Sequence, residues 1–447
     1  LYENRNIFSF FARNYQKGLI LPKKSATIIR KSSRVNKLMT YEQAERLLKE
    51  KGQEQLLRFY KELNGAERSR LLEGIEKVDW SFEEVLKNPE DLSGKGRDIR
   101  PIEGMSLKDI KERREEFFAA GAEAIRSGKV AAVLLAGGQG TRLGVDGPKG
   151  AYNIGITRPL YIFEQQMRNL TDVVEECGAY IPLYVMTSEK NHGETVAFWQ
   201  EHDMFGYPAS EIKFFVQDMA PAVDFEGKIY LESKDYPALS PNGNGGWFSS
   251  MLRAVLCKEL HERGIEWINI YAVDNVLQRI ADPVFIGATL LSGVNCGAKA
   301  VAKAYPEERV GVLCEEDGCP AIIEYYELSE EMANRREKNG GLSYRYGVIL
   351  NYLFRLSKLE ETADRRIPVH IVKKKIEYVD ERGEIKKPER ENGLKFETLA
   401  VDLIRPMESV LPFEVEREKE FAPIKNRTGM DSVETARELL KKNGVEL

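Results

Sequence analysis

The sequence predicts an α/β fold built around a doubly wound, Rossmann-like parallel sheet, and three features support this prediction. The uninterrupted apolar run at residues 130–136 is typical of a strand buried on both faces of a parallel sheet. A loop rich in glycine follows at residues 137–144, at the point where such a strand should end. Beyond this loop, segments with the apolar patterns of strands and helices alternate along the chain, as in α/β proteins.

The other elements follow from the same patterns. Apolar residues recur at helical spacing between Thr40 and Asn88, and helix resumes at residues 108–126 after a linker with Pro101 and Gly104. Strands are predicted at residues 181–186, 212–216, 267–272 and 299–304, and helices at residues 160–176, 192–202, 247–263, 283–292 and 327–338. A hairpin turn is predicted between Cys314 and Cys319, and the tail adds strands at 369–372 and 376–379, a turn at 380–383 and a helix at 432–442.

These patterns divide the chain into four parts. Residues 1–38 begin with leucine, are rich in Lys and Arg and precede the first methionine, so we expect a non-native or disordered extension. Residues 39–105 are predicted to form a helical N-terminal lobe, and residues 106–367 the α/β domain that carries the glycine loop. Residues 368–447 are expected to form a small α+β lobe that closes over a ligand.

The glycine loop has the composition of a phosphate-binding site. Glycines leave backbone N–H groups accessible at the carboxyl end of a strand, where such groups bind phosphate. Arg142 lies inside the loop and Lys149 follows a second glycine turn, so two cations can pair with a polyphosphate. The string is not a P-loop, because no hydroxyl residue follows Lys149, and it only approximates a dinucleotide-binding loop. We therefore predict a nucleotide site of another type.

Three further polar residues are expected at the same edge of the sheet. Asp274 follows the apolar strand at 268–273, and its carboxylate suits Mg²⁺, which binds carboxylates together with phosphate oxygens and water. Gln217 follows another predicted strand and is placed to bind the edge of a base. Asn244 lies in the glycine-rich segment 240–246 and offers both a donor and an acceptor to a flat or hydroxylated ligand.

The string LAGGQGTRLG, followed by PKG, resembles the signature of the UDP-sugar pyrophosphorylases, and GNGG at residues 243–246 resembles the branch that forms UDP-N-acetylhexosamines. The resemblance extends from about residue 60 to the end of the chain. It implies a Rossmann-like nucleotidyltransferase domain that acts on UTP and a sugar 1-phosphate. Further matches, in the family's order, are MTS at 186–188, FFVQDM at 214–219, YAVDN at 271–275, DPVFIG at 282–287, CGAKAV at 296–301, IEY at 323–325 and APIKN at 422–426.

The resemblance also implies roles for individual residues. The expected catalytic cations are Arg142, Lys149 and Lys425. The expected nucleotide-binding residues are Leu135, Ala136, Gly137, Gly138, Lys149, Gln217, Gly243, Asp274 and Lys395. The expected sugar-binding residues are Asn244, Glu324, Tyr325 and Lys425, and the expected Mg²⁺ ligands are Asp274 and, on a later strand, Asp402.

The implied chemistry needs no general base. An oxygen of a sugar phosphate is ionised at neutral pH and can attack the α-phosphorus of UTP directly. The cations and Mg²⁺ would then offset the repulsion between the two polyanions and stabilise the departing pyrophosphate. The expected product with N-acetylglucosamine 1-phosphate is UDP-N-acetylglucosamine.

Two segments depart from the acetylhexosamine branch. That branch carries Asn-Ala-Gly-Asn on one strand and two aromatic residues on a later strand, where this chain has RYGV at 345–348 and LAV at 399–401. Glucose or galactose 1-phosphate is therefore the alternative acceptor. A non-catalytic nucleotide-sugar sensor is the alternative from a different class, although the retained cations favour an enzyme. Dinucleotide-dependent oxidoreduction is disfavoured, because residues 152–172 offer no acidic residue at the end of a second strand.

Composition argues against several other classes. The net charge of -5 and the lack of a dense basic stripe argue against nucleic-acid binding. No apolar run approaches the roughly 18 residues of a membrane span. The five scattered cysteines are expected to be reduced thiols in the cytoplasm, and none of the four histidines has the spacing of a zinc site.

Overall fold

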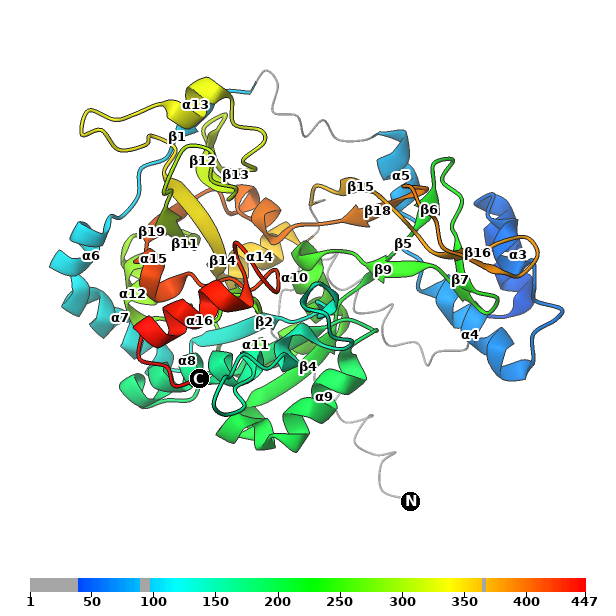
Figure 1. Ribbon diagram of the computed structural model, residues 1–447, viewed down its shortest axis with the longest axis horizontal. Helices are drawn as coiled ribbons and strands as arrows, with labels where there is room; N and C mark the ends of the chain where they lie inside the picture. The colour runs from blue at the N-terminus through cyan, green and yellow to red at the C-terminus, as the bar shows by residue number, and fades with distance from the viewer. Residues whose placement is uncertain (1–38, 89–96, 364–366) are drawn as a thin grey trace, which may run out of the picture. The chain divides into compact units, whose positions relative to one another are not determined.

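A ten-stranded mixed sheet forms the centre of the chain in the computed structural model, which describes residues 39–88, 97–363 and 367–447 (Figure 1). Its main path is β1-β12-β14-β10-β2-β3-β4, with β11, β13 and β19 paired to its side. The predicted extension at residues 1–38 lies outside the described residues. The parallel part consists of β10 (Trp267–Ala272), β2 (Val130–Leu135), β3 (Leu183–Thr187) and β4 (Ile212–Val216).

The strands at the other side of β10 make the sheet mixed. The ten-residue β14 runs antiparallel to both β10 and β11, and β11 in turn pairs with β19 in parallel. The predicted hairpin at Cys314 and Cys319 is confirmed, because β12 and β13 pair across Asp317 and Gly318. These strands are β1 (Ile99–Pro101), β11 (Cys296–Ala302), β12 (Val312–Glu316), β13 (Cys319–Ile323), β14 (Tyr346–Arg355) and β19 (Val410–Glu414).

Helices cover both faces of this sheet, which confirms the doubly wound α/β prediction. Successive residues of β2 alternate between two hydrophobic cores, Ala132 and Leu134 in one and Ala131 and Val133 in the other. The first core also contains residues of α7 (Arg114–Arg126), α8 (Ile162–Cys177), α9 (His192–Glu201), α12 (Pro283–Leu291) and α16 (Val433–Lys442). The second contains residues of α10 (Trp247–Arg253), α11 (Leu256–Glu262) and α14 (Leu356–Thr362).

The N-terminal helices are confirmed, and side chains fix where two of them begin. Thr40 and Asn64 accept hydrogen bonds from backbone N–H groups in the first turns of α3 and α4, and each forms a capping box. The apolar faces of the N-terminal helices share a core with Val223, Leu239 and Phe396, which come from the middle and the end of the chain. This core contains residues from more than one of the predicted lobes. The boundaries predicted between the lobes therefore stay a prediction. The elements are α3 (Tyr41–Glu50), η1 (Glu54–Leu57), α4 (Gly65–Glu76) and α5 (Phe82–Lys87).

Small sheets accompany these helices. The largest of them has three strands in the order β15-β18-β6, and Val372 of β15 lies opposite Lys395 of β18. Figure 1 shows β15 and β18 running between the central sheet and the N-terminal helices. The strands are β5 (Met219–Pro221), β6 (Val223–Asp224), β7 (Leu231–Ser233), β8 (Tyr236–Pro237), β9 (Leu239–Pro241), β15 (His370–Lys374), β16 (Tyr378–Val379), β17 (Ile385–Lys386) and β18 (Gly393–Glu397).

Four predicted elements are wrong in part. The helix predicted at 247–263 is divided between α10 and α11, because Val255 adopts a left-handed backbone with φ 60. The helix predicted at 327–338 is only α13 (Glu330–Asn334), and the chain then turns back so that Arg336 pairs with Leu342. The predicted linker begins as β1, and helix 108–126 is two helices, α6 (Leu107–Glu112) and α7.

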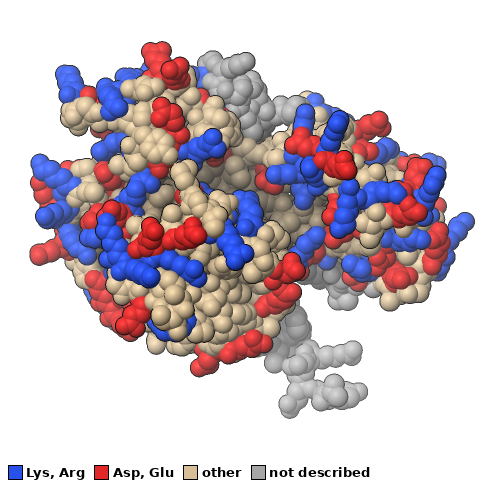
Figure 2. All heavy atoms as spheres, viewed as in Figure 1, with Lys and Arg blue, Asp and Glu red and all other residues tan. Residues whose placement is uncertain are grey.

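Three properties of the described residues bear on the sequence-based exclusions. Among the described residues, no helix has the length and apolar character needed to cross a bilayer. On the face shown in Figure 2, Lys and Arg side chains are interspersed with Asp and Glu, without a broad basic stripe on that face. All five cysteines are free thiols, four of them buried.

Candidate active site

Hydrogen bonds fix the conformation of the glycine loop that follows β2. Gly140 N–H donates to Gly147 O at 2.9 Å, and Lys149 N–H donates to Gly138 O at 3.2 Å. The side chain of Asn191 donates to Ala136 O at 3.0 Å and to Gly138 O at 3.3 Å. Because no acceptor within the described part of the chain is found for the N–H groups of Gly137 and Gly138, these donors can bind a phosphate. The predicted Leu135 ends the strand that delivers this loop, and the predicted Ala136 follows it.

Three cations and one carboxylate gather beside the loop. Lys149 Nζ lies 3.8 Å from Asp274 Oδ2, and their side chains are only 15% and 24% exposed. Burial lowers the pKa of Lys149, and the nearby charges of Arg142 and Lys425 lower it further against the opposing effect of Asp274. The structure therefore brings together the predicted Arg142, Lys149, Asp274 and Lys425.

The segment that carries Lys425 is bound to the segment that carries Asp274. Ile424 N–H donates to Asp274 O at 2.9 Å, and Asn275 pairs with Pro423 as an isolated β-bridge. Lys425 Nζ pairs with Asp431 at 2.9 Å and is partly exposed, so its ammonium can exchange this partner for a substrate phosphate. Lys425 thus lies next to the segment that follows the carboxyl end of β10.

Gln217 lies on the other flank of the loop. It follows β4, is 6% exposed, and its backbone N–H donates to Thr187 O at 2.8 Å. A β-carbon at Gly137 would lie 2.2 Å from Gln217 Nε2, so the carboxamide occupies the space beside the loop. This is the position predicted for contact with a base.

Gly243 and Asn244 pack against the segment 398–400. Gly243 has φ +90, and a β-carbon there would lie 2.2 Å from Thr398 O, so glycine is required twice over. Asn244 Oδ1 accepts a hydrogen bond from Ala400 N at 2.8 Å. The role of Asn244 in sugar binding stays a prediction, and the structure assigns its oxygen to holding Ala400.

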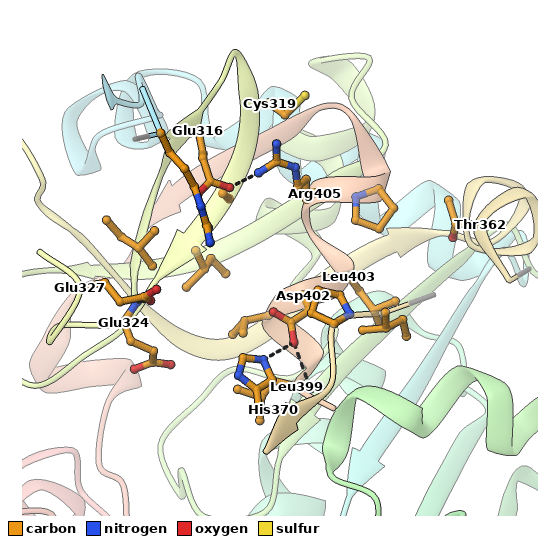
Figure 3. Close-up of a pocket in the computed structure, with 18 of the residues that line it drawn as sticks. Glu316, Cys319, Glu324, Glu327, Thr362, His370, Leu399, Asp402, Leu403 and Arg405 are labelled. Carbon is orange, nitrogen blue, oxygen red and sulfur yellow. Dashed lines mark hydrogen bonds and ion pairs between the residues drawn. The ribbon is translucent and has the colours of Figure 1, made fainter. Parts of the chain in front are cut away.

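A cavity of about 580 Å³ lies between β13 and the segment 399–408 (Figure 3). Glu324, the residue after β13, lines it together with Glu327 and His370. Burial raises the pKa of Glu324, and the carboxylate of Glu327 raises it further. His370 and Lys425 oppose this shift, which places the Lys425 charge within reach of the cavity. Tyr325 is instead 38% exposed and does not line the cavity.

Asp402 differs from its prediction. It lies in the short 3-10 helix η7 (Ala400–Leu403) and not on a strand, because its carboxylate accepts from Leu399 N at 3.2 Å and caps the helix. The same oxygen pairs with His370 Nε2 at 2.9 Å, and this hydrogen bond raises the pKa of His370 against the effect of burial. Figure 3 shows the two side chains pointing at one another. Both hydrogen bonds use Oδ2, and the role of Asp402 as a metal ligand stays a prediction.

Lys395 lies apart from the other predicted cations. It sits on β18, and burial lowers its pKa, as do the neighbouring charges of Lys190 and Lys374. Its contact with the nucleotide phosphates stays a prediction, since its charged neighbours in the structure are these lysines, Glu397 and Glu232.

Two residues of the site were missed in the sequence. Asn191 follows the MTS motif and holds the glycine loop, so the motif itself was a signal that could have led to it. His370 stands 32 positions from Asp402, and no local pattern links the two.

Comparison with known proteins agrees with this site. The sequence profile of the family described as UTP–glucose-1-phosphate uridylyltransferase matches residues 81–442. UDP-N-acetylhexosamine pyrophosphorylase-like protein 1 of Homo sapiens is 39% identical over 420 residues, which cover 88% of this chain and 82% of that protein. UDP-N-acetylglucosamine pyrophosphorylase of Saccharomyces cerevisiae is 36% identical over 416 residues, 87% of either chain.

The fold has the same relatives. The crystal structure of the uridine diphosphate N-acetylglucosamine pyrophosphorylase from Trypanosoma brucei, in complex with an inhibitor, superposes with a TM-score of 0.78 at 26% identity. The superposition covers 91% of this chain and 85% of that one. Sequence profile, close relatives and fold thus agree over nearly the whole described chain, and the chain belongs to the UTP–glucose-1-phosphate uridylyltransferase family.

Proposed function

We propose that this chain is a uridylyltransferase that forms UDP-N-acetylglucosamine and pyrophosphate from UTP and N-acetylglucosamine 1-phosphate. One observation carries the proposal: Arg142 and Lys425 both lie within electrostatic reach of Lys149, beside a loop with accessible N–H groups. A partly buried lysine that two further cations repel indicates a polyanionic ligand. The similarity to the human UDP-N-acetylhexosamine pyrophosphorylase-like protein 1 and to the yeast UDP-N-acetylglucosamine pyrophosphorylase supports an N-acetylhexosamine as the sugar.

The reaction follows from these groups. The loop N–H groups and Lys149 hold the triphosphate of UTP, while Gln217 orients the base. Lys425 pairs with the phosphate of the sugar, which can then approach the α-phosphorus in line without a general base. The new bond joins the sugar phosphate oxygen to the α-phosphorus, and the bond from that phosphorus to the β-phosphate oxygen breaks. Arg142 and Lys149 stabilise the negative charge that leaves with pyrophosphate.

Of the two predicted Mg²⁺ ligands, Asp274 is the one that lies beside the cations of the loop. Asp274 presents a partly exposed carboxylate beside Lys149, and Mg²⁺ commonly uses only one or two carboxylates, with phosphate oxygens and water as the other ligands. Within the described residues, no cluster of three or more His, Cys, Asp and Glu side chains could hold a metal unaided. We propose that Asp274 holds Mg²⁺ only together with UTP, where the ion would offset phosphate charge. The free cysteines support a reducing compartment such as the cytoplasm.

The test measures pyrophosphate release from UTP and Mg²⁺ with N-acetylglucosamine, glucose and galactose 1-phosphates in turn. Turnover that is fastest with N-acetylglucosamine 1-phosphate supports the proposal. Turnover with only the plain hexose phosphates would make the departures at Val348 and Leu399 a change of acceptor. Binding of UDP-sugar without turnover on any acceptor would instead identify a sensor. Omission of Mg²⁺ should abolish the rate.

A further inference from the structure

Lys299 is a fully buried cation away from the substrate groups. Its side chain is 0% exposed in the middle of β11. Its Nζ donates to Asp282 Oδ2 at 3.1 Å, to Glu420 Oε2 at 2.6 Å and to Arg279 O at 3.2 Å. One ammonium therefore binds three acceptors from two segments, residues 279–282 and Glu420, and the mechanism uses none of them directly.

Each partner fixes a segment of backbone. Asp282 Oδ1 accepts from Val284 N at 3.1 Å and so caps α12. Glu420, the last residue of α15 (Arg417–Glu420), also accepts from Arg279 N at 3.1 Å. Lys299 and Asp282 belong to the motifs CGAKAV and DPVFIG, to which the sequence assigned no role. The structure joins the two motifs through this one side chain.

The chain from Glu420 to Lys425 then runs along the segment that begins with Asp274. Asn275 Nδ2 donates to Glu420 O at 2.7 Å, and Ala422 N donates to Asn275 Oδ1 at 2.9 Å. Val276 N also donates to Ala422 O at 3.3 Å and Ile424 N to Asp274 O at 2.9 Å, so four hydrogen bonds hold the two segments together between Glu420 and Ile424. We call residues 420–425 the strap. The Lys299 contact anchors one end of the strap, and Lys425 stands at the other end.

The segment opposite the strap is held from its other side. Gln166 Nε2 donates to Asn275 O at 2.7 Å, and Gln278 Nε2 donates to Ala272 O at 2.6 Å. Both glutamines are fully buried. The segment that carries Asp274 is thus held firmly in place. The position of Lys425 relative to this segment depends on how Glu420 is anchored.

We propose that Lys299 is a positioning residue for uridylyl transfer, which holds Glu420 and thereby places Lys425 beside Asp274 and Lys149. This inference rests on the proposed function, because it concerns the group that binds the sugar phosphate. Loss of the anchor shifts Lys425 relative to the triphosphate site, and small displacements of such a group lower the rate strongly.

A double-mutant cycle on the full chain tests this role. Initial rates of pyrophosphate release are measured at saturating UTP with varied N-acetylglucosamine 1-phosphate, for wild type, Lys299→Met, Lys425→Ala and the double variant. We expect Lys299→Met to lower kcat by about tenfold or more and to raise KM for the sugar phosphate, with KM for UTP unchanged. In the Lys425→Ala background the same substitution should change kcat by less than about twofold.

Arg263 offers a matched control. It pairs with two carboxylates, Glu211 at 2.6 Å and Glu259 at 3.0 Å, and stands before β10 at the amino edge of the sheet, away from the site. Any loss of kcat in Arg263→Met should be equal in the two backgrounds, as for a purely structural change. Equal losses for Lys299→Met in both backgrounds, or no loss in the wild-type background, would overturn the positioning role.

A second variant covers the case in which Lys299→Met does not fold. Glu420→Gln keeps an oxygen to accept from Lys299 and from Arg279 N, and circular dichroism reports its folding. Glu420→Gln should lower kcat less than Lys299→Met does, and its effect should likewise become smaller in the Lys425→Ala background. Unchanged kcat and KM in Glu420→Gln would contradict the inference. A wild-type chain that releases no pyrophosphate contradicts the proposed function itself, whereas an active wild type with an additive cycle contradicts the positioning role alone.

Discussion

The carboxamide of Gln217 fills the space that a side chain at position 137 would need, since a β-carbon on Gly137 would lie 2.2 Å from Gln217 Nε2. Contacts this short do not occur between real atoms, so one of the two must move. The backbone of Gln217 is bound to Thr187 at 2.8 Å, which leaves its side chain as the part that would be displaced. The first glycine of the loop is therefore needed for the neighbouring side chain as well as for phosphate access.

Gly137→Ala should raise KM for UTP by about tenfold, because the hydrogen bonds that Gln217 would make to the base are lost or strained. Thermal stability should change little. The control is Gly193→Ala in α9, where a β-carbon meets nothing within 4 Å. An unchanged KM for UTP in Gly137→Ala would show that Gln217 does not contact the nucleotide.

Lys149→Ala should lower kcat by about 100-fold or more, because it removes a cation that stabilises charge in the transition state. The free energy of unfolding should not decrease, because burial and the neighbouring cations already disfavour the charge of Lys149, as its lowered pKa indicates. Lys129→Ala serves as the control, because Lys129 pairs with Glu266 at 2.9 Å before β2 and β10, at their opposite end. A fully active Lys149→Ala enzyme would refute the assignment.

The same lysine predicts an alkaline limit for kcat/KM of UTP. Burial lowers the pKa of Lys149 from its usual 10.5, so the ammonium loses its proton at a lower pH than a free lysine does. Since kcat/KM reports the free enzyme, it should fall as pH rises through this pKa. In Lys149→Arg, whose guanidinium stays charged, the alkaline fall should disappear even if the rate is lower throughout. A fall that persists in Lys149→Arg would assign it to another group.

Glu324→Gln should weaken the sugar substrate selectively. A carboxylate that accepts from two hydroxyls contributes about 1.5–3 kcal/mol per charged hydrogen bond, so KM for the sugar phosphate should rise about tenfold or more, with KM for UTP unchanged. Glu331→Gln in the first turn of α13 is the matched control. Equal changes in both Michaelis constants would place Glu324 outside the sugar site.

Gly287→Ala should destabilise the fold without touching the site directly. A β-carbon at Gly287 would lie 1.8 Å from Phe117 O, and one at Gly121 would lie 1.8 Å from Pro283 O, so α7 and α12 pack backbone to backbone. Overpacking of this kind costs about 1–3 kcal/mol, measurable as a lower urea midpoint at constant m-value. Gly65→Ala, which meets nothing within 4 Å at the start of α4, should leave the midpoint unchanged.

Elements with strong local patterns could be predicted from the sequence. The strands β2, β4 and β10 and the helix α12 lie within a residue of their predicted bounds, because each combines an apolar run with a clear end signal. The hairpin turn at Asp317 and Gly318 followed from the polar residues between two apolar segments. The gathering of Arg142, Lys149, Asp274 and Lys425 followed from the resemblance and from the rule that polar groups collect at the carboxyl edge.

What could not be predicted depends on contacts between distant residues. Nothing near Asp402 indicates that His370 would take its carboxylate, and nothing near Val255 indicates a left-handed break in a helical stretch. The ten-residue β14 was not among the predicted strands, because its pairing with β10 and β11 depends on segments far apart in the chain. The packing of Asn244 on Ala400 likewise joins positions 156 residues apart.

The core shared by α3, α4 and α5 with strands from later in the chain has a consequence for biosynthesis. Leu71 and Ile75 of α4 leave the ribosome long before Phe396, with which they share that core, has been translated. Until then these helices lack the surface that buries their apolar faces, and short isolated helices are marginal in water. These early helices must therefore be among the last elements to dock, and in the interval they expose the apolar surface that chaperones bind.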